Sequence, residues 1–323
     1  MIEALVARPD GFQAIGNFAR AYPYAIPFYN WQEEARLLIE AKKSGMNIWG
    51  LDQEFIIADR FLFKRLEEIA PNAAARELAR SYKEKAAAGY SKMIESKNPG
   101  SVFMVTGAEE DFQKLETAFK GTRASEGAQI TRELKVSWEI YKKGFANEGY
   151  KSNAQRARLM KTHFMDYYKA AQARGDAAPR VLLKFGALHT MKGRTFTNVY
   201  DLGTFTSELG EATGTGAFNL AVLGVKGTVN AYRVFRPEEK DRHKNYDISQ
   251  SLSFMDVKPL TAVADPDQFT LIDLRALRAE LHSGKLGKVD PGLQRFIWGY
   301  DAVLLFPQVR AATYPRMICS VSH

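Results

Sequence analysis

The segment from Phe185 to Arg194 brings together side chains that are well suited to chemistry. His189, Lys192 and Arg194 place an imidazole, an ammonium and a guanidinium within six residues, directly after an apolar run. An imidazole can accept or release a proton near neutral pH, and a neighbouring cation can hold an anionic group or a developing oxyanion. We therefore expect His189 to be catalytic and Lys192 and Arg194 to bind substrate. Gly186 is expected to let the backbone turn tightly or a ligand approach closely.

A second group of polar residues follows another apolar run. Asp52 and Glu54 come directly after the run that contains Trp49. A carboxylate at this point can orient an imidazole through its second ring nitrogen, or act as an acid. The pattern predicts that Asp52 and Glu54 are catalytic partners and that Trp49 lies in the substrate site.

Each of these groups also has a structural alternative. A single histidine after a strand can be a buried residue whose hydrogen bonds are satisfied. Asp52 and Glu54 can instead cap a helix that begins near Phe55. Arg156, on a predicted helix over residues 153–173, can lie on a solvated helix face.

Strand and helix patterns alternate along much of the chain. Apolar runs predict strands at residues 46–52, 180–189, 218–227, 269–274 and 301–307. Strands separated by helices are typical of an α/β fold with a mostly parallel sheet flanked by helices. Residues 55–147 lack such runs and are expected to form an inserted helical subdomain or cap. We expect residues 1–323 to form a single domain around that insertion.

Size and composition narrow the class of protein. The chain has 323 residues, 46% hydrophobic and 25% charged, which is enough for a sizeable core. Its net charge of +8 comes from 45 Lys and Arg against 37 Asp and Glu, spread along the chain rather than gathered in a patch. We therefore expect no nucleic-acid partner. The partner expected for the His189 group is a small-molecule substrate. The chain has no GxSxG motif, Walker loop or HExxH motif.

Location and assembly are less constrained. No apolar run reaches the ~20 residues that cross a bilayer, so no membrane span is expected. The first residues lack the apolar stretch of a signal peptide, and the single cysteine excludes an internal disulfide. These features leave open a cytoplasmic, periplasmic or secreted location, and they leave the oligomeric state unknown.

The order of the segments resembles the erythromycin esterase-like family, which is related to haem-binding ChaN-like and Tiki-type proteins. WQEEARLLIEAKKSGMNIWGLDQEF resembles the family's helix and the strand after it, which ends in a Gly-x-Asp motif. QRARLMKTHFMDYY resembles its Arg-x-x-x-Met helix, and VLLKFGALHTMKG resembles its next strand, which ends in a histidine. NVYDLGTFTSELGEATGTGAFNLAVLG and YDAVLLFPQVRAAT resemble the later helix and strands. The matches follow the family's order from Tyr22 to Thr313.

The resemblance implies a hydrolase in which water attacks an ester or related carbonyl. His189 would be a base or electrophile, with Asp52 or Glu54 as its orienting or acidic partner. Arg156 would stabilise charge. The family's His-Asn-x-His arrangement is replaced by GALH ending at His189, closer to the Gly-x-x-His of the Tiki-type branch. The family's Gly-Glu-x-x-His motif does not occur in this chain, so we expect either a late start or the loss of that catalytic half.

The same resemblance supports a function of a different class. The domain would bind haem or another large apolar ligand without turnover, with His189 as an axial ligand. A divalent metal is a further cofactor that the Tiki analogy suggests, although no cofactor follows from the residues themselves. The third hypothesis is an interaction domain with no small-molecule site.

Overall fold

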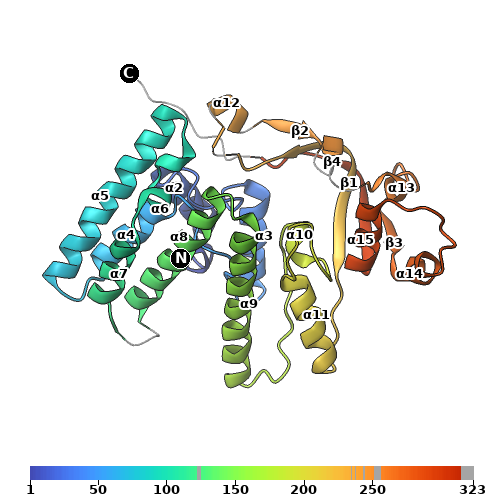
Figure 1. Cartoon of the computed structure of the whole chain (residues 1–323), viewed down its shortest axis with the longest axis horizontal. Coiled ribbons are helices and arrows are strands. Elements are labelled where there is room, and N and C mark those ends of the chain that lie inside the picture. The colour runs from blue at the N-terminus through green and yellow to red at the C-terminus, as the bar shows by residue number, and fades with distance from the viewer. Residues whose placement is uncertain (122–124, 234, 237, 243, 251–255, 314–323) are drawn as a thin grey trace. The chain divides into compact units, whose positions relative to one another are not determined.

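The structure is a computed structural model that describes residues 1–121, 125–233, 235–236, 238–242, 244–250 and 256–313. The chain folds into two compact units (Figure 1). We call residues 1–152, 232–243 and 312–323 the helical unit, and residues 153–231 and 244–311 the sheet unit.

The helical unit contains no strand among its described residues. Its elements are α1 (Ile2–Val6), α2 (Gly11–Ala21), α3 (Gln32–Lys43), α4 (Asp59–Glu68), α5 (Ala73–Ser96), η1 (Pro99–Ser101), α6 (Phe103–Thr106), α7 (Glu109–Ala118), α8 (Glu126–Phe145) and α12 (Glu239–Arg242). α9 (Gly149–Ala173) begins in this unit and continues into the sheet unit. Residues 55–147 are helices and connections wherever they are described, as expected. Their standing as an insertion into a single domain stays a prediction.

Helix α5 illustrates why this region folds as helices. The Asn72 side chain accepts a hydrogen bond from the backbone N–H of Ala75, which caps the first turn. Alanines and long unbranched side chains then favour the helix intrinsically. Ala79, Tyr82 and Ala86 recur at helical spacing and are buried. The helix therefore presents one apolar side to the core.

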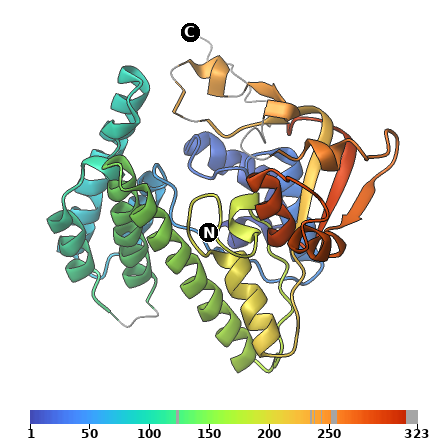
Figure 2. The same ribbon diagram turned by 45° about the vertical axis from the view of Figure 1, so that its right-hand side comes forward.

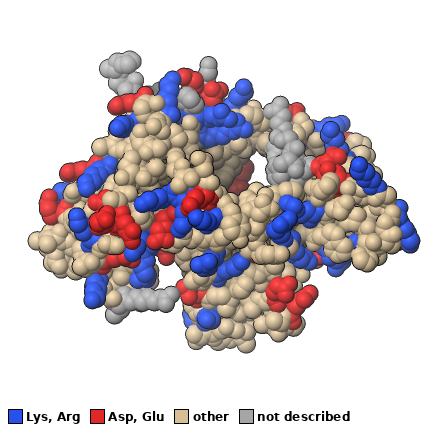
Figure 3. All heavy atoms as spheres, in the orientation of Figure 1, with Lys and Arg blue, Asp and Glu red and all other residues tan. Residues whose placement is uncertain are grey.

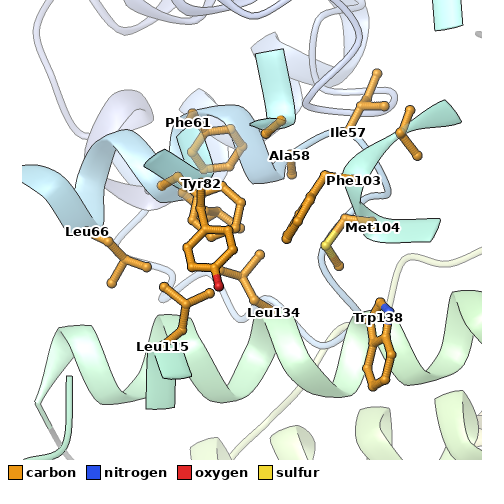
Figure 4. Close-up of a cluster of buried hydrophobic side chains, with 14 of the residues drawn as sticks. Ile57, Ala58, Phe61, Leu66, Tyr82, Phe103, Met104, Leu115, Leu134 and Trp138 are labelled. Atoms are coloured by element: carbon orange, nitrogen blue, oxygen red, sulfur yellow. The ribbon is translucent and has the colours of Figure 1, made fainter. Parts of the chain in front are cut away.

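The core of the helical unit is rich in aromatic side chains. Phe103, Leu115, Leu134 and Trp138 come from α6, α7 and α8 and pack with Tyr82 of α5 (Figure 4). The Phe112 ring of α7 stacks on the Trp138 ring with centroids 4.9 Å apart. Burial of such rings is the main term that holds the helices together.

The sheet unit combines a small mixed sheet with helices. Its further elements are α10 (Ala187–Thr190), α11 (Leu202–Ala212), β1 (Leu220–Asn230), β2 (Asn245–Asp247), η2 (Ile248–Gln250), α13 (Lys258–Thr261), β3 (Thr270–Asp273), α14 (Arg275–His282), α15 (Pro291–Gly299) and β4 (Ala302–Val309). The strand order is β2-β1-β4-β3. β1 and β4 run parallel and side by side, which Figure 2 shows at the right. β2 and β3 pair antiparallel with β1 and β4 respectively.

The α/β class and three predicted strands are confirmed, but the prediction of a mostly parallel sheet is wrong. The runs at 218–227, 269–274 and 301–307 form β1, β3 and β4. One of the three strand pairings is parallel and two are antiparallel. An apolar run predicts a strand but not its direction, because the direction depends on how the connection returns the chain to the sheet.

The predicted strands at residues 46–52 and 180–189 do not form. Both segments lack strand assignment, and His189 lies in the short helix α10 instead of at a strand end. Leu182, in the middle of the second run, is 85% exposed. An apolar run becomes a strand only when a neighbouring strand offers its backbone groups, and no ladder with either segment occurs in the described part of the chain.

One face of the sheet is buried and the other is more exposed. Leu223, Val303 and Leu305 are buried with Phe296 of α15 in the core of the sheet unit. Val222, which points to the opposite face, is 57% exposed. The core of the sheet unit therefore lies on one face of the sheet, where α15 packs.

Candidate functional site

His189 is paired with a buried carboxylate. Its Nδ1 lies 2.8 Å from Oδ2 of Asp201, and the side chains are 16% and 2% exposed. When the carboxylate accepts the Nδ1–H, Nε2 is the ring nitrogen left to accept a proton. The pair thus has the arrangement of a general base and the group that orients it.

Asp201 is itself held in place by helix α11. It is the N-cap residue of α11, and its Oδ1 accepts the backbone N–H of Leu202 at 2.7 Å. The N-terminus of a helix favours a negative charge, so the position suits a carboxylate. α10 lies directly against this end of α11. A Cβ atom on Gly203 would come within 2.2 Å of the Thr190 carbonyl oxygen, and only glycine allows this approach.

A second carboxylate, that of Asp301, forms ion pairs with two basic side chains near His189. Oδ1 of Asp301 lies 2.5 Å from Nζ of Lys192 and 3.2 Å from Nη2 of Arg278. Its Oδ2 accepts the backbone N–H of Asn219 at 2.9 Å. Burial alone raises the pKa of Asp301, but the hydrogen bonds from Asn219 and Lys192 outweigh it and hold the pKa below its ordinary value. Asp301 therefore stays anionic and neutralises its basic neighbours.

The backbone of the turn that carries His189 is held at several points. The Asn219 amide donates to the Thr190 carbonyl at 2.7 Å, and the Tyr300 hydroxyl donates to the Ala187 carbonyl. The Lys192 backbone N–H donates to the carbonyl of Gly299 at 2.8 Å. Burial raises the pKa of Tyr300 to about 12, so its hydroxyl remains a proton donor at neutral pH.

The site lies at the amino ends of two strands, not at a carboxyl end as expected. Asn219 directly precedes β1 and Asp301 directly precedes β4, and the β1–β4 register starts at Leu220 with Ala302. The expectation rested on His189 ending a strand of the sheet. Because residues 181–186 do not pair as a strand, the His189 turn packs against the strand starts instead.

The predicted substrate residues near His189 differ in their surroundings. Lys192 is engaged with Asp301, whereas Arg194 is exposed and its backbone bridges to Tyr200. Gly186 has φ −59°, and an added Cβ atom would meet nothing within 4 Å. The turn therefore does not need glycine there, contrary to the expectation. Substrate contact by Lys192, Arg194 and Gly186 stays a prediction.

Trp49, Asp52 and Glu54 belong to the helical unit, so their partnership with His189 stays a prediction. The Asp52 carboxylate accepts the backbone N–H of Gln53 at 2.9 Å. The backbone N–H of Glu54 donates to the Ser137 hydroxyl at 2.9 Å. The next helix, α4, begins at Asp59, so the alternative that these carboxylates cap a helix at Phe55 is wrong.

Arg156 lies on the part of α9 that belongs to the sheet unit. It is half-buried, and Met160 one turn further on is completely buried. This placement excludes a fully solvated helix face for Arg156. Its role as a charge stabiliser stays a prediction.

Five residues of the site were not predicted from the sequence: Asp201, Asn219, Arg278, Tyr300 and Asp301. Asp201 carried a readable signal, because an aspartate directly before the helical pattern LGTFTSELGEA is a typical N-cap. Asp301 likewise precedes the apolar run of β4. In neither case does the sequence indicate which side chain the carboxylate contacts.

The described residues offer no cluster of metal ligands. Nowhere among them is a group of three or more His, Cys, Asp or Glu placed to hold a metal ion. The described residues that lie together at His189 thus do not fit a divalent metal site. No described helix is both long enough and apolar enough to cross a membrane.

Comparisons with known proteins found one distant structural similarity. No family model matches it, and a search of curated proteins found no match. It is similar to a solved structure of the erythromycin esterase EreC, a histidine-to-asparagine mutant in its open conformation. The TM-score is 0.49 and the identity 10%, over 87% of this chain and 73% of that chain. At this level the comparison carries no conclusion about activity.

Proposed function

We propose that the chain is a hydrolase of the erythromycin esterase-like type that acts on an ester or related carbonyl substrate. The observation that carries the proposal is the 2.8 Å contact between Nδ1 of His189 and the buried carboxylate of Asp201. The imidazole is partly exposed while its partner is not, which is the arrangement that a solvent-fed general base requires. The order of the segments, which resembles the esterase-like family, adds to this interpretation.

In the proposed reaction His189 activates water. Asp201 accepts the Nδ1–H, so that Nε2 removes a proton from water as the oxygen attacks the carbonyl carbon. The imidazolium that forms is stabilised by the neighbouring carboxylate and then protonates the leaving oxygen. A positioned base of this kind contributes roughly 10²–10⁴-fold to a rate.

The charged neighbours take different parts in this proposal. We assign Lys192 to positioning, because its ammonium is held by Asp301. The exposed Arg194 is the cation available to an anionic substrate group. Arg156 would stabilise charge, Asp52 or Glu54 would supply an acid, and Trp49 would contact substrate. Family-level likeness sets a reaction type and not a substrate.

The proposal is tested with His189→Gln and Asp201→Asn against a panel of short and aromatic esters. Both variants should lower kcat by roughly 10²-fold or more, His189→Gln by removing the base and Asp201→Asn by releasing its ring. His282→Gln is the matched control, because His282 also lies in the sheet unit, at the end of α14. Esterase activity that persists in His189→Gln, or that is absent from the unaltered chain over the whole panel, contradicts the proposal.

The ligand-binding alternative has one observation in its favour. A histidine whose Nδ1 is bound by a carboxylate presents Nε2 as a metal ligand, so His189 would be the residue that holds haem iron. Adding haem and recording its Soret band distinguishes the two functions. A shift that disappears in His189→Ala supports haem binding, and an unchanged spectrum removes it.

A further inference from the structure

Three residues at the strand starts converge on the turn that carries His189. They are Asn219, before β1, and Tyr300 and Asp301, before β4; we call them the strand-start clamp. Their hydrogen bonds reach Ala187, Thr190 and Lys192, which lie on both sides of His189. None of the three belongs to the His189–Asp201 pair.

In the first part of the clamp, Asn219 and Asp301 at the two strand starts form two hydrogen bonds with each other. The Asn219 backbone N–H donates to Oδ2 of Asp301 at 2.9 Å, and the Asp301 backbone N–H donates to the Asn219 carbonyl at 2.8 Å. The Asn219 side chain is oriented as well, because its Oδ1 lies 3.0 Å from the Ser207 hydroxyl, which also donates to the Gly203 carbonyl at 2.8 Å. Its amide nitrogen is thereby aimed at the Thr190 carbonyl, 2.7 Å away.

The second part holds the turn from its other side. Lys192 is bound twice, through its ammonium to Asp301 at 2.5 Å and through its backbone N–H to the Gly299 carbonyl at 2.8 Å. The Tyr300 hydroxyl donates to the Ala187 carbonyl and lies 3.4 Å from Oγ1 of Thr190. Tyr300 is 1% exposed, so water cannot readily replace its hydroxyl.

We propose that Asn219, Tyr300 and Asp301 are positioning residues that fix the imidazole of His189 against Asp201. The proposal rests on the proposed function, since it assigns these residues to the base of that reaction. The clamp holds the backbone before and after His189, and α11 holds Asp201. Because a ring nitrogen 2.8 Å from its partner tolerates little displacement, loosening the turn releases the imidazole from the carboxylate.

The sharpest test is Tyr300→Phe, which removes one hydroxyl and keeps the buried ring. We expect kcat to fall about tenfold while KM changes less than about twofold, since the base is displaced and substrate contacts are kept. Asp301→Asn, which weakens the hold on Lys192, should act in the same direction. Tyr200→Phe is the matched control, because Tyr200 lies in the same unit and is 62% exposed.

A spectroscopic readout separates positioning from general stability. Nitrogen-15 spectra of the histidine rings, recorded where the imidazole is neutral, report which ring nitrogen carries the proton. In the unaltered chain His189 should be protonated at Nδ1, with its signal identified by loss in His189→Gln. Tyr300→Phe and Asp301→Asn should shift His189 toward protonation at Nε2, as in a free imidazole, while Tyr200→Phe should not. Circular dichroism establishes whether each variant is folded. If Asp301→Asn is unfolded, the test rests on Tyr300→Phe.

The outcomes distinguish this inference from the proposed function. If no ester is hydrolysed but the ring proton moves in Tyr300→Phe, the clamp stands and the hydrolase proposal fails. If hydrolysis depends on His189 but a folded Tyr300→Phe keeps the unaltered kcat and ring protonation, the clamp is overturned.

Discussion

At the scale of single residues, Asp201 and Gly203 have different roles where α10 and α11 meet. Asp201 supplies the carboxylate for His189, and the missing side chain of Gly203 makes room for the Thr190 carbonyl. Both residues lie at the N-terminus of α11, Asp201 as its N-cap and Gly203 in its first turn. The position of the His189 imidazole therefore depends on the missing side chain at Gly203 as well as on the Asp201 carboxylate.

Gly203→Ala tests the steric requirement. The added Cβ atom would lie 2.2 Å from the Thr190 carbonyl oxygen, a contact with backbone that can be relieved only by moving α10 from α11. We expect a loss of about 1–3 kcal/mol in the free energy of unfolding, measured by urea denaturation, together with reduced esterase activity.

Gly186→Ala is the matched control at the other end of the same turn. Its Cβ atom would meet no atom within 4 Å, and φ of −59° suits any residue. We expect the free energy of unfolding to change by no more than about 0.5 kcal/mol. Equal losses in the two variants would show that the close approach of α10 to α11 is not a constraint.

At the scale of elements, α4 begins with a buried carboxylate that has an unusual titration. Asp59 is 3% exposed; its Oδ1 accepts the Arg60 backbone N–H at 2.9 Å, and its Oδ2 has no hydrogen-bond partner. Burial raises the pKa of Asp59 from 3.8 to about 7, although the charge of Arg60 opposes the shift. Arg60 lies over the Tyr90 ring, 3.6 Å from its centroid, and donates to the Pro23 carbonyl at 2.7 Å.

This titration predicts that the helical unit loses stability as the pH rises. Between the unfolded pKa of 3.8 and the folded pKa of about 7, Asp59 is protonated in the folded chain and ionised in the unfolded one. The folded state then binds more protons, so raising the pH favours unfolding until both states are ionised. Between pH 5 and pH 8 the contribution of Asp59 should fall by about 2–3 kcal/mol.

Asp59→Asn should remove this contribution while keeping the shape of the side chain. The difference in the free energy of unfolding between the variant and the unaltered chain should grow in favour of the variant from pH 5 to pH 8. Urea denaturation followed by tryptophan fluorescence measures it, with the buried Trp138 as a reporter in the helical unit. A difference that is the same at both pH values would show that Asp59 titrates as an ordinary carboxyl.

Asp111→Asn is the control of opposite sign. Burial raises the pKa of Asp111, but hydrogen bonds from the Ala108 backbone and the Tyr82 hydroxyl outweigh it, so the pKa is lowered. Its contribution is therefore present above the unfolded pKa and lost as the pH falls. Replacing Asp111 should cost stability at neutral pH and less in acid.

At the scale of the whole molecule, charge is positive in total but mixed in distribution. The chain has a net charge of +8 and an isoelectric point near 9.3. On the face shown in Figure 3, Lys and Arg are interspersed with Asp and Glu. Many of the cations are also paired, as Arg65 is with Glu126 and Arg80 with Glu67. Such a surface attracts polyanions weakly and without a defined binding track.

We therefore expect only weak, salt-sensitive binding to nucleic acid. Affinity for a fluorescent duplex should fall about tenfold or more between about 50 and 200 mM salt and should not depend on its sequence, because phosphate contacts alone would carry it. Fluorescence anisotropy at several salt concentrations measures this. Tight binding to one sequence at the higher salt concentration would contradict the expectation that the chain has no nucleic-acid partner.

The sequence by itself determined the local elements that have a strong period. The lack of strand-like apolar runs predicted helices over residues 55–147, which include α5, and apolar runs predicted β1, β3 and β4. Local patterns also located His189 as the residue around which a site can form. These features depend on neighbours within a few residues, where spacing and intrinsic preference decide the backbone.

Only the tertiary structure decided which groups face one another. The partner of His189 is 12 residues away at Asp201, and the partner of Lys192 is 109 residues away at Asp301. The apolar run at residues 180–189 resembled a strand, yet it has no ladder partner in the part of the chain that the structure describes. A strand, an ion pair or a base with its carboxylate each requires a second group brought close by the fold, and a linear pattern does not specify that group.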